Sequence, residues 1–297
     1  MPRTLLVVNA DDLGISEGVN LGIAQAHRAG ILTSASVMAN MPAFEGAARL
    51  RQECPSLAVG VHLNLTAGSP LLPPSRVPHL VDGDGRFHRL DHLLARLTLR
   101  RIDPSQVEAE LSAQVERALG AGFAPDHLDS HHHVHCHPAL HSVVVRLARR
   151  YGVGGIRCPV ELGLAPRRAG DPARGAGRGR GSRTAAQLKA LGLSLLGLML
   201  RRRVRGAGLL ATDRFLGLSL GSGFSAEALQ TSLRRLPHGT VELMCHPGHP
   251  DARLATLTRF VEGREAELAA LLHPGTGELL RRMGVALGSY SDLSGWR

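Results

Sequence analysis

The stretch Leu5-Leu6-Val7-Val8-Asn9-Ala10-Asp11-Asp12-Leu13-Gly14 decides the fold of this chain. Its mostly apolar first half predicts a strand buried on both faces, as in a parallel sheet. Asp11 and Asp12 come at the carboxyl end of that strand, where parallel α/β folds build their active sites. In an extended chain the two carboxylates point to opposite sides, so each can have its own role. Taken alone, either carboxylate could instead cap a helix that begins near Ser16.

Short strand-like runs alternate with helical patterns on both sides of this stretch and along all 297 residues. This alternation predicts a parallel sheet with crossover helices. About eight strands favour an α/β fold with a closed or nearly closed (β/α) barrel in one domain, residues 1–297, with a doubly wound open sheet as the alternative. The predicted strands are 5–10, 31–38, 57–65, 126–135, 155–158, 213–220, 240–245 and 285–290; the predicted helices are 16–30, 42–53, 104–119, 139–151, 184–205, 225–236 and 256–272.

Composition excludes several classes of protein. Aromatic residues make up only 3% of the chain, which argues against a base-stacking surface for single-stranded nucleic acid. The four cysteines form no CxxC pair, which argues against a disulfide framework or a thiolate zinc site and indicates a reducing compartment. The first apolar run is too short for a signal peptide, so we expect a cytoplasmic protein.

The positive charge is concentrated in one insertion. Residues 161–205 carry a net charge of +9 of the chain's total of +10, and they combine a Gly/Arg-rich stretch with an apolar helix at 184–205 that has a basic end. Such a helix could make a peripheral membrane contact, bind nucleic acid, or simply dock on the barrel or at a homodimer interface. We favour docking, and we expect no nucleic-acid partner.

Histidines follow two later strands of the predicted sheet. His62 lies inside an apolar strand, and taken alone it would be a core histidine. The run from Asp129 to His137 holds five of the chain's 16 histidines, and strand alternation predicts that His131, His133 and His135 share one face. A row of imidazoles is poor core material but suits a divalent ion.

One aspartate and two or three histidines with an open position are typical of a catalytic metal site. The ion could be Zn²⁺, Mn²⁺, Co²⁺ or Ni²⁺, and Mg²⁺ fits less naturally because it prefers oxygen ligands. A bound ion would activate a water and polarise a carbonyl or phosphoryl oxygen, which leaves the second carboxylate as a general base.

Three motifs together give the chain a family resemblance: residues 9–14 (NADDLG), residues 60–66 (GVHLNLT) and residues 127–135 (HLDSHHHVH). With them the chain resembles the YdjC-type carbohydrate deacetylases, a family that includes chitooligosaccharide deacetylase, and it is similar to hopanoid-biosynthesis deacetylases. The resemblance implies a distorted (β/α) barrel, a divalent metal, and removal of an acetyl group from an N-acetylated amino sugar, either an oligosaccharide or a lipid-linked sugar. The basic insertion at 161–205 departs from the family pattern.

The resemblance also implies roles for individual residues. By position, Asp12, His62 and His131 match the metal ligands, and Asp11 matches the general base. His246, in a His-Pro pair after a late strand, is assigned as the acid or as a stabiliser of the oxyanion. The alternative enzyme class is a metal-dependent phosphoesterase, although two-metal phosphatases normally need more carboxylate ligands.

Overall fold

The computed structural model describes residues 4–161 and 180–296, of which residues 180–187 and 189 are described by their backbone alone. The Gly/Arg-rich part of the predicted insertion, residues 162–179, lies outside the described residues. The helix predicted at 184–205 is present and longer, as α6 (Arg180–Gly206). Among the described residues, no helix combines the length and the apolar character needed to cross a membrane.

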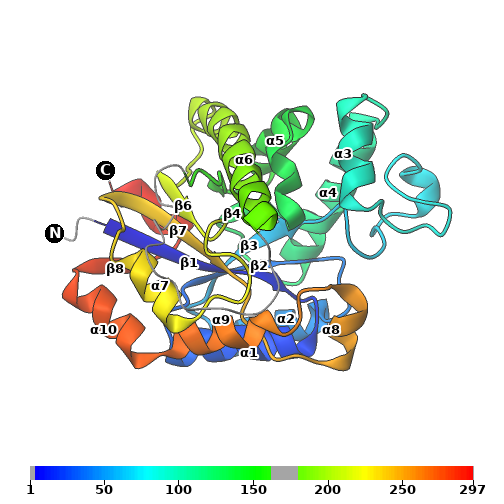
Figure 1. The fold of residues 1–297 in the computed structure, drawn as a ribbon. Coiled ribbons are helices and arrows are strands. Elements are labelled where there is room, and N and C mark those ends of the chain that lie inside the picture. Colours follow the sequence, from blue (N-terminus) through cyan, green and yellow to red (C-terminus); the bar gives the residue numbers. More distant parts are fainter. Residues whose placement is uncertain (1–3, 162–179, 297) are drawn as a thin grey trace.

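A curled sheet of eight parallel strands forms the centre of the described chain (Figure 1). Seven strands follow the order β5-β4-β3-β2-β1-β7-β6, and β8 pairs with the first half of β1. The strands are β1 (Thr4–Leu13), β2 (Ser34–Val37), β3 (Ala58–Leu63), β4 (His127–Ser130), β5 (Gly155–Ile156), β6 (Arg214–Leu216), β7 (Gly239–Cys245) and β8 (Val285–Gly288).

The two outer strands of the sheet approach each other. Gly155 of β5 forms a parallel bridge with Leu210, and the Phe215 amide of β6 donates to the Val160 carbonyl at 3.0 Å. These bonds join the ends of the curled sheet without a regular ladder. The predicted distorted (β/α) barrel is therefore confirmed.

Two groups of helices cover the curled sheet on opposite sides (Figure 1). Ser16 caps α1 by accepting from the Val19 amide, so neither Asp11 nor Asp12 acts as the helix cap. The other helices are α1 (Glu17–Ala29), α2 (Phe44–Glu53), α3 (Leu90–Thr98), α4 (Pro104–Gly120), α5 (His141–Tyr151), α7 (Ala226–Leu233), α8 (Ala252–Leu257), α9 (Gly263–Leu272) and α10 (Pro274–Arg282), with 3₁₀ turns η1 (Pro74–Arg76), η2 (His131–Cys136), η3 (Pro138–Leu140) and η4 (Tyr290–Gly295).

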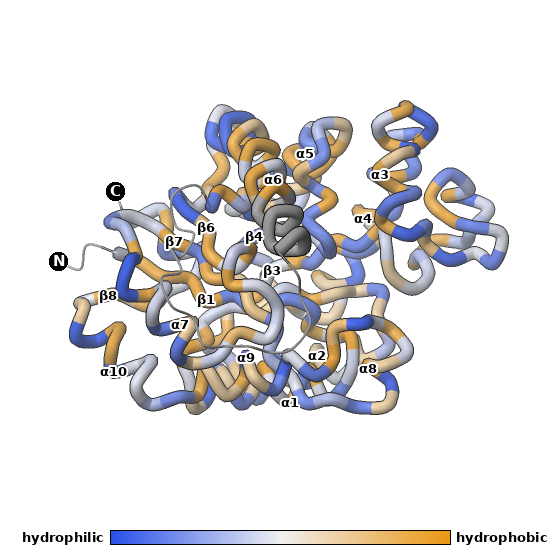
Figure 2. Tube along the Cα trace, viewed as in Figure 1, coloured by the Kyte–Doolittle hydropathy of each residue, from blue (hydrophilic) through white to orange (hydrophobic). Residues whose placement is uncertain are grey.

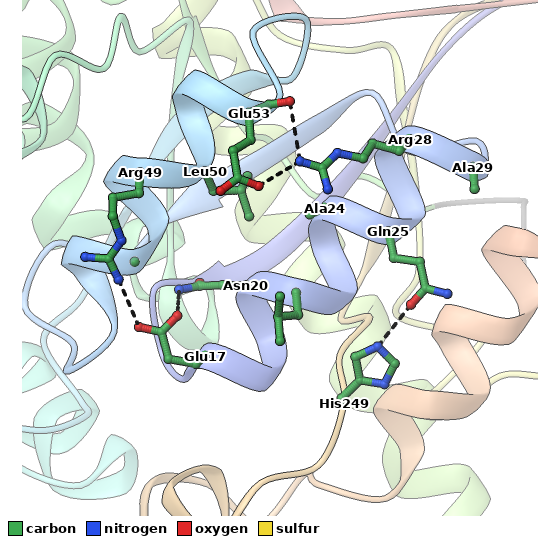
Figure 3. Close-up of a pocket in the computed structure, with 12 residues that line it drawn as sticks. Glu17, Asn20, Ala24, Gln25, Arg28, Ala29, Arg49, Leu50, Glu53 and His249 are labelled. Atoms are coloured by element: carbon green, nitrogen blue, oxygen red, sulfur yellow. Dashed lines mark hydrogen bonds and ion pairs between the residues drawn. The ribbon is translucent and has the colours of Figure 1, made fainter.

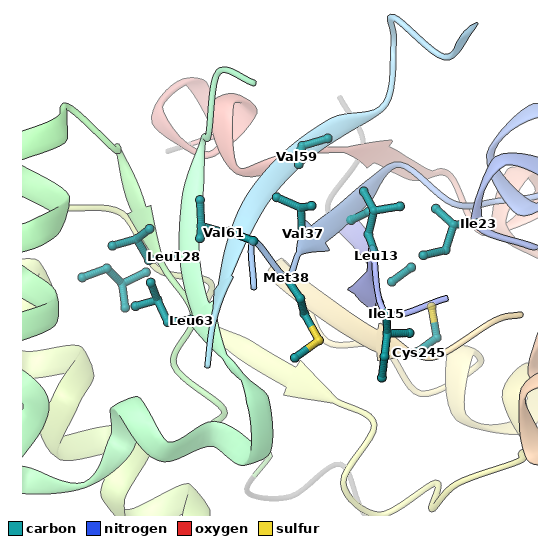
Figure 4. Close-up of a cluster of buried hydrophobic side chains, with 14 of the residues drawn as sticks. Leu13, Ile15, Ile23, Val37, Met38, Val59, Val61, Leu63, Leu128 and Cys245 are labelled. Carbon is teal, nitrogen blue, oxygen red and sulfur yellow. The ribbon is translucent and has the colours of Figure 1, made fainter. Parts of the chain in front are cut away.

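The hydrophobic core lies between the sheet and these helices. Figure 4 shows Leu13, Val37, Val61 and Leu128 from four neighbouring strands together with Ile23 of α1. All five side chains are buried. Burial of this apolar area supplies the main driving force for folding and holds the strand ends in register.

Two predicted elements are wrong. The strand expected at 126–135 ends at Ser130, and the chain continues as η2, because His132 and His133 have positive φ angles of 56° and 55°. The helix expected at 256–272 is two helices, α8 and α9, separated near Thr258, whose backbone is extended. The helices α3 and α10 were not predicted.

Candidate metal centre and active site

The first carboxylates of the site lie where β1 leaves its regular geometry. The pairing of β1 with β2 shifts between Ala10 and Leu13, and Asp12 has a φ of 68°, in the left-handed region. A non-glycine residue rarely adopts this conformation unless its surroundings hold it there. The shift sends Asp11 and Asp12 into different surroundings, and both side chains are buried.

Asp12, His62 and His131 come together although they are far apart in the chain. Their ligand atoms all lie within 4.8 Å of one another. Asp12 Oδ1 is 3.6 Å from His62 Nε2 and 3.2 Å from His131 Nδ1. Parallel pairing of β1 with β2 and of β2 with β3 brings the ends of β1 and β3 to the same edge of the sheet, and η2 begins beside them.

This donor set fits a divalent cation. Two ligand atoms about 2.1 Å from one ion, at a tetrahedral angle, lie about 3.4 Å apart, which matches the two separations above. Apart from these two imidazole contacts, Asp12 Oδ1 is buried without a partner among the described residues, so it is available as a ligand. His62 Nδ1 lies 2.9 Å from Asp129 Oδ1, and when it donates there His62 Nε2 keeps its lone pair for an ion.

Arg264 of α9 holds the other oxygen of Asp12. Its Nη2 donates to Asp12 Oδ2 at 2.6 Å, and both side chains are buried. Burial alone would raise the pKa of Asp12, but Arg264 and His131 hold it well below its ordinary value. Asp12 is therefore a carboxylate with one oxygen fixed by protein and the other facing the two imidazoles.

Arg157, which follows β5, fills the neighbouring region. It donates to Asp11 through two bonds of 2.7 Å, lies 2.7 Å from Asp129 Oδ2 and donates to Glu242 at 2.8 Å. Tyr290 donates to the second oxygen of Glu242 at 2.6 Å. Asp11, His62 and Asp129 are also spaced as a metal site, but the guanidinium of Arg157 already bonds both of these carboxylates.

The carboxylates at this end of the sheet outnumber the guanidinium groups. Four carboxylates face two arginines, which leaves a formal charge of −2 when the imidazoles are neutral; the groups are Asp11, Asp12, Asp129, Glu242, Arg157 and Arg264. Burial alone would lower the pKa of His62, yet Asp129 and Asp11 raise it to about 9. This excess of negative charge is what a divalent cation would balance.

His246 follows β7 and is held by α9. Its backbone amide donates to Glu267 Oε2 at 2.6 Å, and its Nδ1 lies 3.8 Å from the same oxygen. Burial alone would lower the pKa of His246, but Glu267 raises it above its ordinary value, and Asp11 and Asp12 add to this effect. The structure thus gives His246 an acidic partner and electrostatic coupling to both aspartates.

A close helix–loop approach positions the His246 loop. A Cβ on Gly22 of α1 would lie 2.5 Å from Gly248 Cα, and one on Gly18 would lie 2.3 Å from the His249 carbonyl oxygen. A side chain at either position would push the loop away, because real Cβ atoms do not approach so closely. The glycines of α1 therefore help to set the height of His246 above the sheet.

The prediction that His131, His133 and His135 share one strand face is wrong. The left-handed turn at His132 and His133 sends these rings in different directions. His135 contacts Ser130 Oγ at 2.5 Å and the Arg157 carbonyl at 2.9 Å through its two nitrogens, and burial lowers its pKa to about 4. His135 therefore stabilises the turn, and His133 packs its ring edge-on against Phe215.

Sequence reasoning gave no role to five buried residues of this site: Arg157, Asp129, Glu242, Arg264 and Glu267. For Arg157 and Glu242 a signal existed, because each lies in a predicted strand that is otherwise largely apolar. A charged residue in a buried strand requires a partner of opposite charge. For Arg264 and Glu267 we find no such signal, since both lie in a helix rich in charged residues.

A separate groove lies on the surface between α1 and α2. It has a volume of about 560 Å³ and is lined by Arg28, Glu53, Arg49 and Glu17, among others (Figure 3). These charged side chains pair with one another, Arg28 with Glu53 and Arg49 with Glu17. The groove includes none of the predicted site residues, so it is not the candidate centre.

Comparisons with known proteins cover nearly the whole chain. The family model described as YdjC-like protein matches residues 5–282. A carbohydrate deacetylase of Geobacillus stearothermophilus is 37% identical, covering 98% of both chains, and one of Brevibacillus brevis is 35% identical, covering 97% of this chain and 99% of the relative. A crystal structure from Enterococcus faecalis V583, provisionally named a cellobiose-phosphate cleavage protein, superposes with a TM-score of 0.74 at 26% identity, covering 98% of this chain and 99% of that one.

Proposed function

This chain belongs to the YdjC-like family, and we propose that it is a metal-dependent carbohydrate deacetylase that removes the acetyl group from an N-acetylated amino sugar. The observation that carries the proposal is the convergence of Asp12, His62 and His131, in which Asp12 Oδ1 is buried and faces both imidazoles. We further propose that residues 1–297 form one domain, because every strand of the described chain joins one sheet.

We assign the metal to the three converging side chains. A divalent ion, when bound there, polarises a carbonyl oxygen and lowers the pKa of a water. Asp129 orients His62 through its Nδ1, and Arg264 orients Asp12 through Oδ2. The candidate ions are Zn²⁺, Mn²⁺, Co²⁺, Ni²⁺ and Mg²⁺; the imidazole ligands favour the first four.

We assign proton removal to Asp11. Arg157 grips both of its oxygens and Asn9 donates to Oδ1 at 3.0 Å, so the carboxylate is held in one orientation. Each oxygen keeps a lone pair that is able to accept a proton from the attacking water. A base held in this way contributes roughly 10²–10⁴-fold to the rate.

We assign proton delivery, or stabilisation of the oxyanion, to His246. Its Nδ1 faces Glu267, which leaves Nε2 for the leaving amine or the developing negative charge. The raised pKa of His246 supports this role, because it favours the protonated imidazole. Protonation of the leaving nitrogen completes cleavage of the amide bond.

The substrate is an oligosaccharide or a lipid-linked amino sugar. Amide hydrolysis is favoured over phosphate-ester hydrolysis because the second acidic cluster, which a two-metal phosphatase would use, already contains Arg157. Phosphate release without acetate release from a mixed substrate panel would instead support a phosphoesterase.

The decisive experiment compares three variants for metal content and acetate release from a panel of N-acetylglucosamine conjugates. His131→Ala should lose both the metal and activity, because it removes a ligand. Asp11→Asn should keep the metal and lose roughly 10²–10⁴-fold in rate. His238→Ala, an exposed histidine, is the control and should match the wild type. Full metal content in His131→Ala would contradict the proposed metal centre. Acetate release at the wild-type rate by Asp11→Asn would contradict the assignment of Asp11 as the base.

A further inference from the structure

The helix α6 exposes an apolar stripe. Leu188, Leu191, Leu195 and Met199 are 68%, 47%, 52% and 50% exposed, and they make up four of the nine large apolar side chains exposed on the described surface. Their spacing of three, four and four residues places them on one face along about three helical turns. The other five are scattered over several elements.

The opposite face of α6 packs on the protein. Ser194, Leu200 and Val204 are buried, and a Cβ on Gly197 would lie 3.0 Å from the Pro159 carbonyl oxygen. α6 contacts α5 and η2. The predicted docking on the barrel therefore accounts for one face of the helix and leaves the apolar stripe without a partner within the described chain.

The charge of α6 is entirely positive. Arg180–Gly206 contains seven basic and no acidic residues, and Arg202 and Arg203 are exposed in its last turns. Figure 2 shows the apolar middle of α6 in orange and its hydrophilic C-terminal end in blue. An apolar stripe that ends in arginines is the pattern of a helix that lies in a lipid interface with cations at the headgroups.

The same charge argues against the other occupants. A second copy would bring an equally basic α6 against this one in either orientation, and like charges would repel. A nucleic acid would contact the arginines but would leave the leucines in water. An anionic membrane surface satisfies both the leucines and the arginines.

We propose that the outer face of α6 docks the protein on an anionic lipid surface, with Leu188, Leu191, Leu195 and Met199 inserted and Arg202 and Arg203 at the headgroups. The docking is peripheral, in keeping with the absence of a spanning helix among the described residues. It does not depend on the proposed reaction, because none of these residues contacts the candidate metal centre.

The test is co-sedimentation of the full chain with vesicles of mixed phosphatidylglycerol and phosphatidylcholine, and with pure phosphatidylcholine vesicles. The wild type should sediment with the anionic vesicles far more than with the neutral ones. The stripe variant Leu191→Gln/Leu195→Gln/Met199→Gln should lose about tenfold or more in partitioning. The charge variant Arg202→Gln/Arg203→Gln should also bind the anionic vesicles more weakly than the wild type does. This difference should be larger in low salt, where charges are screened less.

A matched control carries the same number of changes elsewhere. Leu21→Gln/Leu99→Gln/Leu119→Gln removes three scattered exposed leucines and should sediment like the wild type. Circular dichroism and acetate release from a soluble substrate should be unchanged in the stripe variant. Retained acetate release keeps a failure of the docking proposal separate from a failure of the proposed reaction.

Three results would overturn docking on lipid. The first is that the wild type stays in the supernatant when anionic vesicles are sedimented. The second is that the stripe variant sediments with these vesicles as much as the wild type does. A concentration-dependent dimer of the wild type that the stripe variant abolishes would assign the stripe to a second copy of this chain.

Discussion

Asp11 and Asp12 are neighbours in the chain, but their carboxylates lie in two regions that differ in how completely the carboxylate oxygens are paired. Around Asp11, the guanidinium of Arg157 bonds three carboxylates, and Tyr290 donates to one of them. Around Asp12, one oxygen is bonded to Arg264, while Oδ1 and Arg264 Nη1 are buried without a hydrogen-bond partner among the described residues.

This difference distinguishes the region around Asp11, which contains its own cation, from the proposed metal site around Asp12. A buried polar group without a partner costs free energy, so proteins rarely keep one without a reason. In the region around Arg157, each of the three carboxylates already bonds to the guanidinium, so none of them lacks a cationic partner. The region around Asp12 keeps donor atoms spaced for an ion, and Asp12 itself has a left-handed backbone conformation, as the proposed metal site would explain.

The largest effect is expected when Arg157 is removed. Arg157→Met leaves Asp11, Asp129 and Glu242 buried without their cation, so the free energy of unfolding should fall by about 3–5 kcal/mol in urea denaturation. In metal-free protein, His131→Ala should change the free energy of unfolding by less than about 1 kcal/mol, since the His131 ring is partly exposed and faces Asp12 at the proposed metal site. A small loss in Arg157→Met, or a large one in His131→Ala, would reverse the roles of the two regions.

Removing Arg264 should have a smaller effect, on metal binding. Arg264→Gln frees Asp12 Oδ2 from its 2.6 Å bond, so the carboxylate loses its fixed orientation. The metal dissociation constant, measured by calorimetry, should rise about 10–100-fold, as for other groups that orient a ligand. Arg259→Gln, an exposed arginine nearby, is the control. Tighter metal binding in Arg264→Gln would show that the guanidinium mainly competes with the ion.

The smallest effect is expected at the periphery. Asp213 accepts from Arg205 at 2.8 Å and from the Thr240 amide at 3.0 Å, and both charged side chains are nearly half exposed. Burial would raise the pKa of Asp213, but Thr240 and Arg205 lower it below its ordinary value of 3.8. Because the folded-state pKa is depressed, the stabilisation is complete above the ordinary value and is lost as the pH falls through the folded-state pKa.

Asp213→Asn should therefore cost about 1 kcal/mol or less at pH 7, with the exposed pair discounted for solvent screening. The difference from wild type in urea denaturation should shrink as the pH is lowered below 3.8. A difference that stays constant down to acid pH would mean that Asp213 acts through packing and not through its charge.

Much of the fold follows from patterns that act locally. The buried strand before Asp11, the helix capped at Ser16 and the long helix Pro104–Gly120 are visible in the sequence because burial and capping impose a period on neighbouring residues. The error at 126–135 has an equally local cause. Nothing in a run of histidines reveals that His132 and His133 adopt left-handed angles, because tertiary contacts hold them there.

The site likewise combines residues that local sequence patterns reveal with residues that only tertiary contacts bring in. Residue types near strand ends marked the clusters that contain Asp12, His62 and His131, and the family resemblance assigned these three as ligands; the structure brings them together. Arg264 and Glu267 were missed because α9 lies more than 200 residues from Asp12 in the chain and carries no motif. Long-range ion pairs leave little trace in one sequence, since each partner alone looks like an ordinary surface charge.

By itself, the sequence determined which residues have ligand chemistry and that they lie near the ends of strands in a parallel sheet, because hydrophobic burial and the strand period are written locally. Only the tertiary structure decided that Asp11 receives a guanidinium on both oxygens, whereas Asp12 receives one on a single oxygen. That choice depends on where Arg157 and Arg264 arrive in space, and distance in three dimensions, not along the chain, sets the strength of a charge–charge interaction.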